Sequence, residues 1–373
     1  MFRLSNLIKS TLQEQKSRSL DGSIIIWNMT NRCNLLCHHC YSKASANEKE
    51  SLSLEDILKT IPKLKIANIN FVIFSGGEPL LRKDIFEIAQ SMKDNKIMTY
   101  LSTNGTYITE KNAQKIIDTF NYIGISIDGI GEVHDYFRGQ KGSYDKSIEA
   151  IKTIQKKGGN AGIRFTITKE TESSFYDIFT LAEELNVNKI YISHLVYSGR
   201  GKENLEIDIS KEKRREYVNF MINKAFEYYE NGKDIDIVTG NMEMDAIMLL
   251  KEFEKKYPDF VNSLKNRLKS WGGNSAGKRL GNMDWNGFVK PDPFFPMTIG
   301  NYLEKDFDKI WLDDNNELLK KLREFPRNIK GKCSSCKYID ICNGGSRSRA
   351  YAISGDLWDE DPSCYLTLEE IKG

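Results

Sequence analysis

The sequence contains few cysteines and histidines, has almost no net charge and lacks long apolar runs. Its 54 Lys and Arg residues nearly balance 52 Asp and Glu residues, so the formal net charge is only +2. Interspersed charges of both signs give no indication of a nucleic-acid-binding surface. No run approaches the roughly 18 apolar residues of a membrane span, and the first 16 residues lack the apolar core of a signal peptide. These absences predict a cytoplasmic protein without nucleic-acid or membrane partners.

Seven cysteines are present, and they form two groups. This grouping favours metal ligation in a reducing compartment over a disulfide framework. Cys33, Cys37 and Cys40 have the spacing C-x3-C-x2-C, and three thiolates leave one metal position open. A four-iron cluster held in this way keeps one iron free for a ligand, which indicates a reactive centre. A zinc site or a set of buried thiols is the alternative, because spacing alone does not identify the metal.

The second group lies near the C-terminus, as Cys333, Cys336, Cys342 and Cys364, with the spacing C-x2-C-x5-C-x21-C. Four thiolates suit either a closed iron-sulfur cluster or a zinc ribbon. The spacing by itself does not decide between these two centres.

Short apolar, β-branched runs recur along the first 200 residues, and each precedes a polar or glycine-rich turn. Helical periodicity separates them, as at Ile85, Ile88, Ala89 and Met92. This alternation predicts parallel βαβ units. Six units suggest an α/β fold with a partial TIM-type barrel, although an open doubly wound sheet fits the same count. The predicted strands cover residues 23–30, 69–78, 97–105, 121–129, 161–168 and 189–199.

In βα barrels, functional side chains gather at the carboxyl ends of the strands. Polar or glycine residues occupy those ends here, so we expect them on one rim with the first cysteine group. These residues are Gly76, Gly77, Glu78, Ser102, Asn104, Ser126, Asp128, Arg164, His194 and Arg200. On generic grounds, the serines, Asn104 and Asp128 could instead be ordinary turn formers, and His194 a structural residue.

The remainder of the chain predicts a helical segment followed by a smaller unit. Residues 203–270 have helical periodicity, with a core-facing apolar stripe between Val218 and Tyr229. A glycine-rich stretch begins at Trp271, Asn286-Gly287 indicates a hairpin, and a further helix is expected over 305–323. We therefore divide the chain into an N-terminal extension (1–22), a barrel (23–200), a helical segment (201–270) and a C-terminal domain (271–373).

The string CNLLCHHCY, followed by GGEP at 76–79, resembles the signature of the radical S-adenosylmethionine (SAM) superfamily. This resemblance implies a (βα)6 barrel in which the free iron of a 4Fe-4S cluster is chelated by SAM. An electron from a low-potential donor, such as ferredoxin or flavodoxin, then cleaves SAM to a 5'-deoxyadenosyl radical that abstracts hydrogen from carbon. The cofactors supply the chemistry, and the protein supplies position.

The resemblance also assigns roles to the rim residues. It implies that Gly76, Gly77 and Glu78 bind the methionine amino group through the backbone. By the same resemblance, Arg164 pairs with the SAM carboxylate, and His39 occupies a position against the adenine where the superfamily usually has an aromatic residue. The positions that contact the ribose and carboxylate are Ser102, Asn104, Ser126 and Asp128.

The C-terminal cysteines resemble the auxiliary-cluster domain called twitch, a shortened SPASM domain. The resemblance implies a second, auxiliary 4Fe-4S cluster, and only one, since Asp292 and Ser346 stand where the longer pattern has cysteines. Arg347 and Arg349 are candidates to bind substrate or to brace this cluster. Arg200 is a candidate clamp for a substrate carboxylate, and His194 a candidate for a proton or substrate role. Weaker candidates are Lys278, Arg279 and Lys290.

Several longer segments, including YISHLVYSGRG and NGGSRSRAYAISGDLWDEDPSCY, resemble the radical SAM proteins of haem d1 biosynthesis. That family acts on the tetrapyrrole 12,18-didecarboxysiroheme and converts two propionate side chains to oxo groups. The related deacetylase, which removes acetate groups from the same substrate, is an alternative, and Lys290 stands where haem d1 relatives would have His. A peptide maturase is another, although the 32 residues before Cys33 are too few for a leader-binding domain. GGEP argues against a metal-binding regulator.

Overall fold

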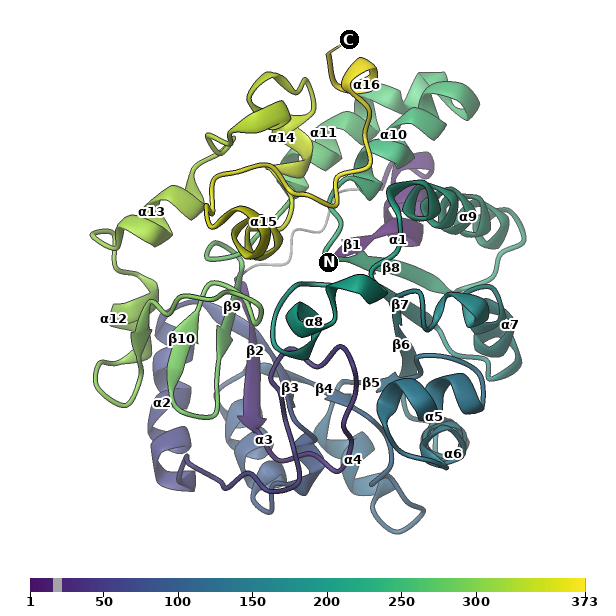
Figure 1. Cartoon of the computed structure of the whole chain (residues 1–373). Helices are drawn as coiled ribbons and strands as arrows, with labels where there is room; N and C mark the ends of the chain where they lie inside the picture. The colour runs from purple at the N-terminus through teal and green to yellow at the C-terminus, as the bar shows by residue number, and fades with distance from the viewer. Residues whose placement is uncertain (16–21, 373) are drawn as a thin grey trace.

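The computed structural model describes residues 1–15 and 22–372. Its centre is a curved 11-stranded sheet in the order β1-β8-β7-β6-β5-β4-β3-β2-β9-β10-β11 (Figure 1). From β2 to β8, neighbouring strands are parallel. These strands are Ser23–Thr30 (β2), Ile69–Gly76 (β3), Met98–Thr103 (β4), Tyr122–Ser126 (β5), Ala161–Ile167 (β6), Lys189–His194 (β7) and Asp236–Gly240 (β8).

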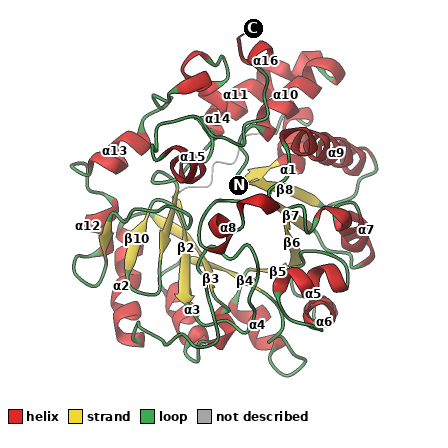
Figure 2. Ribbon diagram, viewed as in Figure 1, coloured by secondary structure: helices red, strands yellow, loops and turns green. Residues whose placement is uncertain are grey.

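The six strands expected from the sequence are β2 to β7, which confirms the α/β fold. Helices cover the outside of the curved sheet (Figure 2). The barrel is partial because its edge strands β2 and β8 pair with other strands instead of with each other: β8 with β1 (Phe2–Arg3), and β2 with β9 (Leu280–Met283). Since β2 to β8 are parallel, their carboxyl ends share one rim.

The expectation that residues 201–270 are helical throughout is wrong at one place. Asp236–Gly240 forms β8, a parallel neighbour of β7. Its central residues Ile237 and Val238 are buried at 0% and 3% exposure. The strand β1, which lies within the predicted N-terminal extension, pairs with β8 in the antiparallel sense.

The helices that precede the C-terminal segment include one over the apolar periodicity predicted at residues 85–92. In α3, Ile85, Ile88, Ala89 and Met92 form the buried face. These helices are α1 Leu4–Leu12, α2 Leu54–Ile66, η1 Pro79–Leu81, α3 Ile85–Asp94, α4 Ala113–Thr119, α5 Glu132–Arg138, α6 Ser143–Lys156, η2 Glu172–Ser174, α7 Asp177–Glu184, α8 Arg200–Glu203, η3 Leu205–Ile207, α9 Lys211–Glu230, α10 Asp245–Lys256, η4 Pro258–Phe260 and α11 Val261–Trp271.

The apolar stripe of α9 is core, as predicted. Val218, Met221, Ile222, Ala225 and Phe226 are all buried at 2% exposure or less, whereas Tyr229, at the end of the predicted stripe, is partly buried against the core. Burying a side chain of the size of Val, Ile, Met or Phe contributes roughly 1.5–3 kcal/mol each, so this face anchors the helix. No helix within the described residues has the length and apolar character that spanning a membrane would require.

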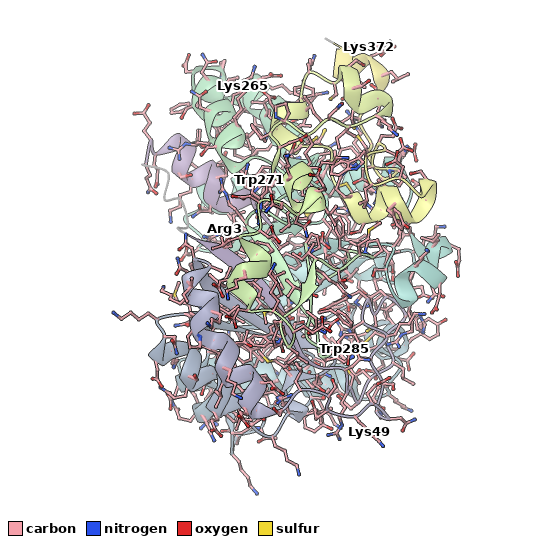
Figure 3. All side chains as sticks on the ribbon, turned by 90° about the vertical axis from the view of Figure 1, so that its left-hand side faces the viewer. Arg3, Lys49, Lys265, Trp271, Trp285 and Lys372 are labelled. Atoms are coloured by element: carbon pink, nitrogen blue, oxygen red, sulfur yellow. The ribbon has the colours of Figure 1, made fainter. Side chains whose placement is uncertain are left out.

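The C-terminal segment extends the barrel sheet before it forms its own small helices. Phe288–Lys290 (β10) returns antiparallel to β9 across Asn286-Gly287, which confirms the predicted hairpin. Trp271, at the end of α11, packs on Phe2 of β1 with ring centroids 5.0 Å apart, and Figure 3 labels Trp271 beside Arg3. The remaining elements are β11 Gly300–Asn301, α12 Phe307–Trp311, α13 Glu317–Arg323, η5 Gly331–Ser335, α14 Ile339–Cys342, α15 Arg347–Ser354 and α16 Leu368–Lys372.

The single helix expected over residues 305–323 is two helices, α12 and α13. Asn316 begins α13 as an N-cap, because its side chain accepts a hydrogen bond from the Leu319 backbone N–H at 3.0 Å. Asparagine stabilises a helix start in this way more than it stabilises a helix interior. The polar run before Asn316 therefore separates the two helices.

Candidate active site

The first cysteine group lies in the loop that follows β2. Cys33 and Cys37 are 8% and 6% exposed, and Cys40 is partly buried. The Leu35 backbone N–H points at Cys33 Sγ, at 3.4 Å. Cys40 Sγ lies 3.4 Å from Ser42 Oγ. The loop thus keeps three thiols close together with local donors directed at the sulfur atoms.

These thiols are free, and their environment disfavours an isolated thiolate. Burial raises the pKa of Cys33 to about 12 and that of Cys37 to about 11. Metal binding requires the deprotonated form and offsets its charge. Among the described residues, no three His, Cys, Asp or Glu side chains are arranged to hold a metal ion together. A four-iron cluster binds each thiolate at a different iron, so the three thiols need not meet at one metal ion. Three cysteine donors with a fourth position left open are the set that such a cluster needs.

Arg200, at the start of α8, holds the cysteine loop from one side. Its backbone N–H donates to the Cys40 carbonyl at 2.9 Å. Its guanidinium donates from Nε to the Cys37 carbonyl at 2.7 Å and from Nη1 to the Ala44 carbonyl at 3.2 Å. This arrangement differs from the clamp for a substrate carboxylate that the sequence led us to expect, because the guanidinium already binds the loop.

Two neighbours of Arg200 strengthen the same contact. Asn204 Nδ2 donates to the His38 carbonyl at 2.9 Å. Gly199 has a φ of +57°, and a Cβ built there would lie 2.3 Å from the Tyr41 carbonyl oxygen. Only glycine permits both this backbone conformation and this close approach.

The end of α5 holds the loop from the other side. The backbone N–H groups of Leu36 and His38 donate to the carbonyls of Arg138 and Phe137, at 3.2 and 3.0 Å. The Arg138 side chain turns toward the cysteines, with Nη1 3.7 Å from Cys37 Sγ. Neither Arg138 nor Asn204 was identified from the sequence, because a lone arginine or asparagine in a loop carries no local signal.

His39 lies between the second and third cysteines of the loop. Its ring stacks on Phe137 with centroids 4.7 Å apart and an interplanar angle of 4°. Burial lowers the pKa of His39 to about 4, so the imidazole is neutral at pH 7. Phe137 covers one face of the ring, and an adenine would have to stack on the other.

The glycines of the GGEP segment fit the cysteine loop closely. The Gly77 N–H donates to the Thr30 carbonyl at 2.8 Å. A Cβ at Gly76 would lie 2.3 Å from the Thr30 oxygen, and one at Gly77 would lie 2.1 Å from the Arg32 oxygen. These glycines therefore let the end of β3 approach the start of the cysteine loop without steric conflict.

Glu78 is fully buried and joins the ends of β3 and β4. Its Oε1 accepts from Leu80 N–H and Thr103 Oγ1 at 3.1 and 2.8 Å, and its Oε2 accepts from the Asn104 N–H at 2.8 Å. Burial raises the pKa of Glu78 to about 7, although these donors oppose the shift. Its carboxyl group is therefore held by donors within the protein.

Three of the expected SAM-contacting residues lie together inside the barrel. Ser126 pairs in register with Arg164, and Ser102 pairs with Gly124, over which the Arg164 side chain passes. The Arg164 guanidinium carbon lies 4.5 Å from the Tyr191 ring centroid. The hydroxyls of Ser102 and Ser126 and the Arg164 guanidinium hydrogen-bond to no other side chain or backbone group in the described part of the chain.

The other two expected residues are engaged within the protein. Asn104 Nδ2 donates to Asn34 Oδ1 at 3.0 Å, and its Oδ1 accepts from the Thr106 N–H at 2.9 Å. Asp128 is 0% exposed and forms an ion pair with Arg138. Both residues support the loops of the rim, and neither presents a free polar group.

His194 ends β7 and is also buried, at 1% exposure. Its Nε2 lies 3.8 Å from Asp245 Oδ2, and Tyr365 donates to Asp245 Oδ1 at 2.8 Å. Burial lowers the pKa of His194, so its ring is neutral at pH 7. Because Tyr365 follows Cys364 directly, this polar group connects β7 with the C-terminal cysteines.

The four C-terminal cysteines lie in the same region of the structure, although 30 residues lie between the first and the last. Cys333, Cys342 and Cys364 are buried, and Cys336 is partly buried. Besides burial, the charges of the other three raise the pKa of Cys342 well above its ordinary value. Such mutual effects mean that the four thiols lie within reach of one another's charges, in the same region of the C-terminal segment.

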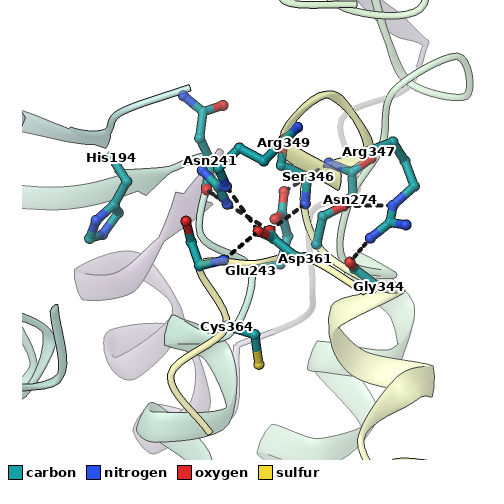
Figure 4. Close-up of polar contacts among 12 residues, drawn as sticks. His194, Asn241, Glu243, Asn274, Gly344, Ser346, Arg347, Arg349, Asp361 and Cys364 are labelled. Atoms are coloured by element: carbon teal, nitrogen blue, oxygen red, sulfur yellow. Dashed lines mark hydrogen bonds and ion pairs between the residues drawn. The ribbon is translucent and has the colours of Figure 1, made fainter. Parts of the chain in front are cut away.

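Arg347 lies in the interior beside this group. It is 0% exposed, and its Nη1 donates to the carbonyls of Leu357 and Asp359 at 2.8 and 2.5 Å. Its Nη2 also donates to the Gly344 carbonyl (Figure 4). This placement favours the bracing role for Arg347 over the substrate-binding role.

Arg349 is equally buried and pairs with Asp361 (Figure 4). It also donates to the carbonyls of Leu195 and Asn241, at 3.2 and 2.5 Å. Its guanidinium is therefore used inside the protein, and substrate binding by Arg349 is not favoured either.

The remaining candidates occupy local positions. Ser346 caps α15 by accepting from the Arg349 N–H at 3.3 Å, and Asp292 accepts from the Phe294 N–H at 2.8 Å. Lys290 Nζ lies 3.4 Å from Asp284 Oδ2. Lys278 lies over the Phe325 ring at 5.3 Å, and Arg279 donates to the Ser270 carbonyl at 3.1 Å.

Comparison with known proteins agrees with this geometry. Residues 27–182 match the model of the radical SAM superfamily. The chain is 36% identical to pre-heme d1 synthase of Dinoroseobacter shibae, over 99% of this chain and 93% of that protein. It is 37% identical to Fe-coproporphyrin III synthase of Methanosarcina barkeri, over 93% of this chain and 89% of that protein. A solved structure of Streptococcus suis SuiB bound to S-adenosylmethionine matches with a TM-score of 0.72 at 17% identity, covering 92% of this chain and 77% of SuiB.

A partial βα barrel with an open three-cysteine loop at the carboxyl rim and a cysteine-rich tail defines a class of SAM-dependent iron-sulfur enzymes. The chain belongs to the radical SAM superfamily, among relatives that are named haem-pathway synthases. A 4Fe-4S cluster and SAM are the cofactors of this superfamily, and twitch and SPASM members carry auxiliary clusters. The similarity to SuiB supports the fold alone.

Proposed function

We propose that this enzyme acts in haem d1 biosynthesis, where it converts propionate side chains of 12,18-didecarboxysiroheme to oxo groups. The observation that carries the proposal is the 36% identity to pre-heme d1 synthase over 99% of the chain. The three-thiolate loop supplies the type of site that such chemistry needs. Hydrogen abstraction from an unactivated propionate carbon is the chemistry that the cluster and SAM supply when bound.

In this proposal Cys33, Cys37 and Cys40 bind the SAM-chelating cluster. Arg164, which lies inside the barrel beside Ser126, pairs with the SAM carboxylate, and Ser102 and Ser126 bind SAM through their free hydroxyls. An arginine fork matches the geometry of a carboxylate. Backbone groups of Gly76 to Glu78 bind the amino group, and the second face of His39 receives the adenine.

The four C-terminal cysteines bind one auxiliary 4Fe-4S cluster in the proposed enzyme. Their convergence and the absence of a fifth nearby cysteine in the sequence suit a closed, fully ligated cluster. When bound there, the cluster would supply an acceptor for the electron released when the substrate is oxidised. A ferredoxin or flavodoxin supplies the electron needed at the first cluster, and the tetrapyrrole is the small-molecule partner.

The test is product analysis by mass spectrometry after anaerobic incubation with didecarboxysiroheme, SAM and reductant. The proposal expects deoxyadenosine together with a tetrapyrrole whose propionates have been altered. A control without SAM should leave the substrate unchanged. Deoxyadenosine without any change in the tetrapyrrole would contradict the substrate assignment.

Removal of acetate groups from the same substrate is the second candidate. It is favoured by the 37% identity to Fe-coproporphyrin III synthase and by Lys290, which stands where a haem d1 enzyme would be expected to have His. The same mass spectra separate the two reactions. Loss of acetate with intact propionates would replace the first candidate with the second.

A further inference from the structure

A buried ion pair lies directly against the first cysteine group. Arg138, at the end of α5, has a side chain that is 10% exposed, and its Nη2 pairs with Asp128, which is 0% exposed. The other terminal nitrogen of Arg138, Nη1, lies 3.7 Å from Cys37 Sγ. The guanidinium thus stands between a carboxylate and a cysteine sulfur.

Asp128 is fixed so that it cannot follow a moving partner. Its Oδ1 accepts from the Thr166 N–H at 2.6 Å, and its own N–H donates to His134 Nδ1 at 3.1 Å. Burial lowers the pKa of His134 to about 4, so this ring is a neutral acceptor at pH 7. His39 adds a weak polar contact, with Nε2 3.9 Å from Asp128 Oδ2.

The direction of the Arg138 guanidinium distinguishes it from the other buried arginines of the site. Arg349 and Arg347 direct their free N–H groups at backbone carbonyls, which is the usual way to satisfy a buried guanidinium. Arg138 directs Nη1 at sulfur, and its Nε has no hydrogen-bond partner among the described residues. Asp128 already compensates the buried charge of Arg138, so the Nη1 group is left to act on the Cys37 sulfur.

We propose that Arg138, oriented by Asp128, is a positioning residue that sets the reduction potential of the cluster held by Cys33, Cys37 and Cys40. This inference depends on the proposed assignment of that trio as cluster ligands. Reduction adds one electron and therefore one negative charge, and a cation and N–H donor beside a ligand sulfur stabilise the more negative state. The negative charge of the neighbouring Asp128 carboxylate disfavours the reduced state and so reduces the effect of Arg138 on the potential.

Two substitutions should therefore move the potential in opposite directions. Arg138→Gln removes the cation and leaves Asp128 facing the cluster, so the potential becomes more negative. Asp128→Asn leaves the cation unopposed, so the potential becomes less negative. Arg138→Lys retains the charge and should stay near the wild-type value.

The measurement is a dye-mediated redox titration of the reconstituted full-length enzyme, followed by electron paramagnetic resonance. The SAM-binding cluster is recognised as the signal that changes when SAM is added. Arg214→Gln is the matched control, because Arg214 also forms a buried ion pair, with Asp208, and has no contact with a cysteine within the described residues. The control should leave the potential unchanged.

Each result then decides the inference. Opposite shifts in the two variants, with an unshifted control, support it. Unchanged potentials, or shifts in the same direction, overturn it, and Asp128→Asn alone is decisive if Arg138→Gln fails to fold. A wild-type enzyme without any SAM-responsive signal overturns the proposed function and this inference together, whereas an intact wild-type signal with unshifted variants overturns only the inference.

Discussion

Arg349 Nη2 lies 2.7 Å from Asp361 Oδ2, and both side chains are completely buried. The same guanidinium binds the carbonyls of Leu195 and Asn241, which follow β7 and β8. Asp361 precedes Cys364 by three residues. One ion pair therefore joins the cysteine-rich tail to the carboxyl rim of the barrel.

Arg349→Met should destabilise the protein strongly. Removing one member of a buried ion pair leaves an uncompensated charge and typically costs about 3–5 kcal/mol. We expect this loss in the free energy of unfolding, measured by anaerobic denaturant titration. Iron retained by the C-terminal cysteines should fall in parallel, because their loop loses its attachment.

Two further variants test the reason for that loss. Arg349→Met combined with Asp361→Leu removes both charges and should recover part of the stability. Lys330→Ala breaks an exposed pair with Asp356 and should change stability by less than about 1 kcal/mol. A single variant as stable as the Lys330 control would show that the buried pair does not attach the tail.

The two cysteine groups should bind iron independently. Replacing Cys33, Cys37 and Cys40 with Ala should lower the iron content from about eight to about four atoms per chain, since one cluster of four irons remains. SAM cleavage under dithionite should disappear, as measured by deoxyadenosine formation. Cleavage that persists in this variant would exclude the trio as the reactive site.

The sequence predicted the six strands β2 to β7, because each is a short β-branched run before a turn. It did not predict β8, in which Ile237 and Val238 form a run too short to stand out between two helices. Nor could it predict that β9 pairs with β2. That pairing joins residues 24–27 to residues 280–283. It depends on which edge strand of the curved sheet is left unpaired, and no local sequence pattern shows this.

The two cysteine groups stand out in the sequence because their spacing is a local signal, and their role as cluster ligands stays a prediction. The residues that hold them were missed or assigned another role, because their function comes from burial and from partners on other elements. Arg200 illustrates this: its charge suggested a substrate clamp, but its distances to Cys37 and Ala44 show that it binds the cysteine loop. Arg138 depends in the same way on Asp128 and Cys37.

Arg200→Met should make the first cluster labile. A hydrogen bond from a charged donor is worth roughly 1.5–3 kcal/mol, so the loss of even one of the two should make iron release to a chelator about 10- to 100-fold faster. The measurement follows the decay of the cluster absorbance under anaerobic conditions. If Arg200 instead clamped substrate, the release rate would be unchanged and the KM for the tetrapyrrole would rise.

A control on the same loop is available. Lys43 pairs with Glu203, and both side chains are more than half exposed, at 55% and 56%. Lys43→Ala should therefore alter the release rate less than about fivefold, as expected for a pair worth less than 1 kcal/mol.

Glu183 should give part of the acid sensitivity of the fold. Its hydrogen bond with Lys233, aided by Lys224 and Tyr228 and opposed by partial burial, lowers its pKa to about 2. A carboxyl whose folded pKa is depressed contributes stability above its unfolded pKa of about 4.5, and this contribution is lost as pH falls toward 2. Glu183→Gln should therefore cost about 1 kcal/mol at pH 7, after allowance for solvent screening, and progressively less below pH 4.5.

The measured quantity is the difference in unfolding free energy between Glu183→Gln and wild type at each pH. Acid weakens metal binding in both proteins, so that effect cancels in the difference. Glu48→Gln, at an exposed position, serves as the control and should show a flat difference. A flat difference for Glu183→Gln as well would contradict the assignment.

Gly77→Ala should weaken SAM binding while leaving most of the fold intact. The added methyl group would lie 2.1 Å from the Arg32 carbonyl oxygen, so the end of β3 and the start of the cysteine loop must separate. Calorimetric titration with SAM should show at least a tenfold loss of affinity. Gly232→Ala is the control, because its Cβ would meet nothing within 4 Å and would cost only the strain of its φ of +67°, about 1–2 kcal/mol. That turn follows α9, far along the chain from the cysteine loop, so Gly232→Ala should bind SAM normally. Equal SAM affinity in the two variants would show that the close approach of β3 to the loop is not needed for binding.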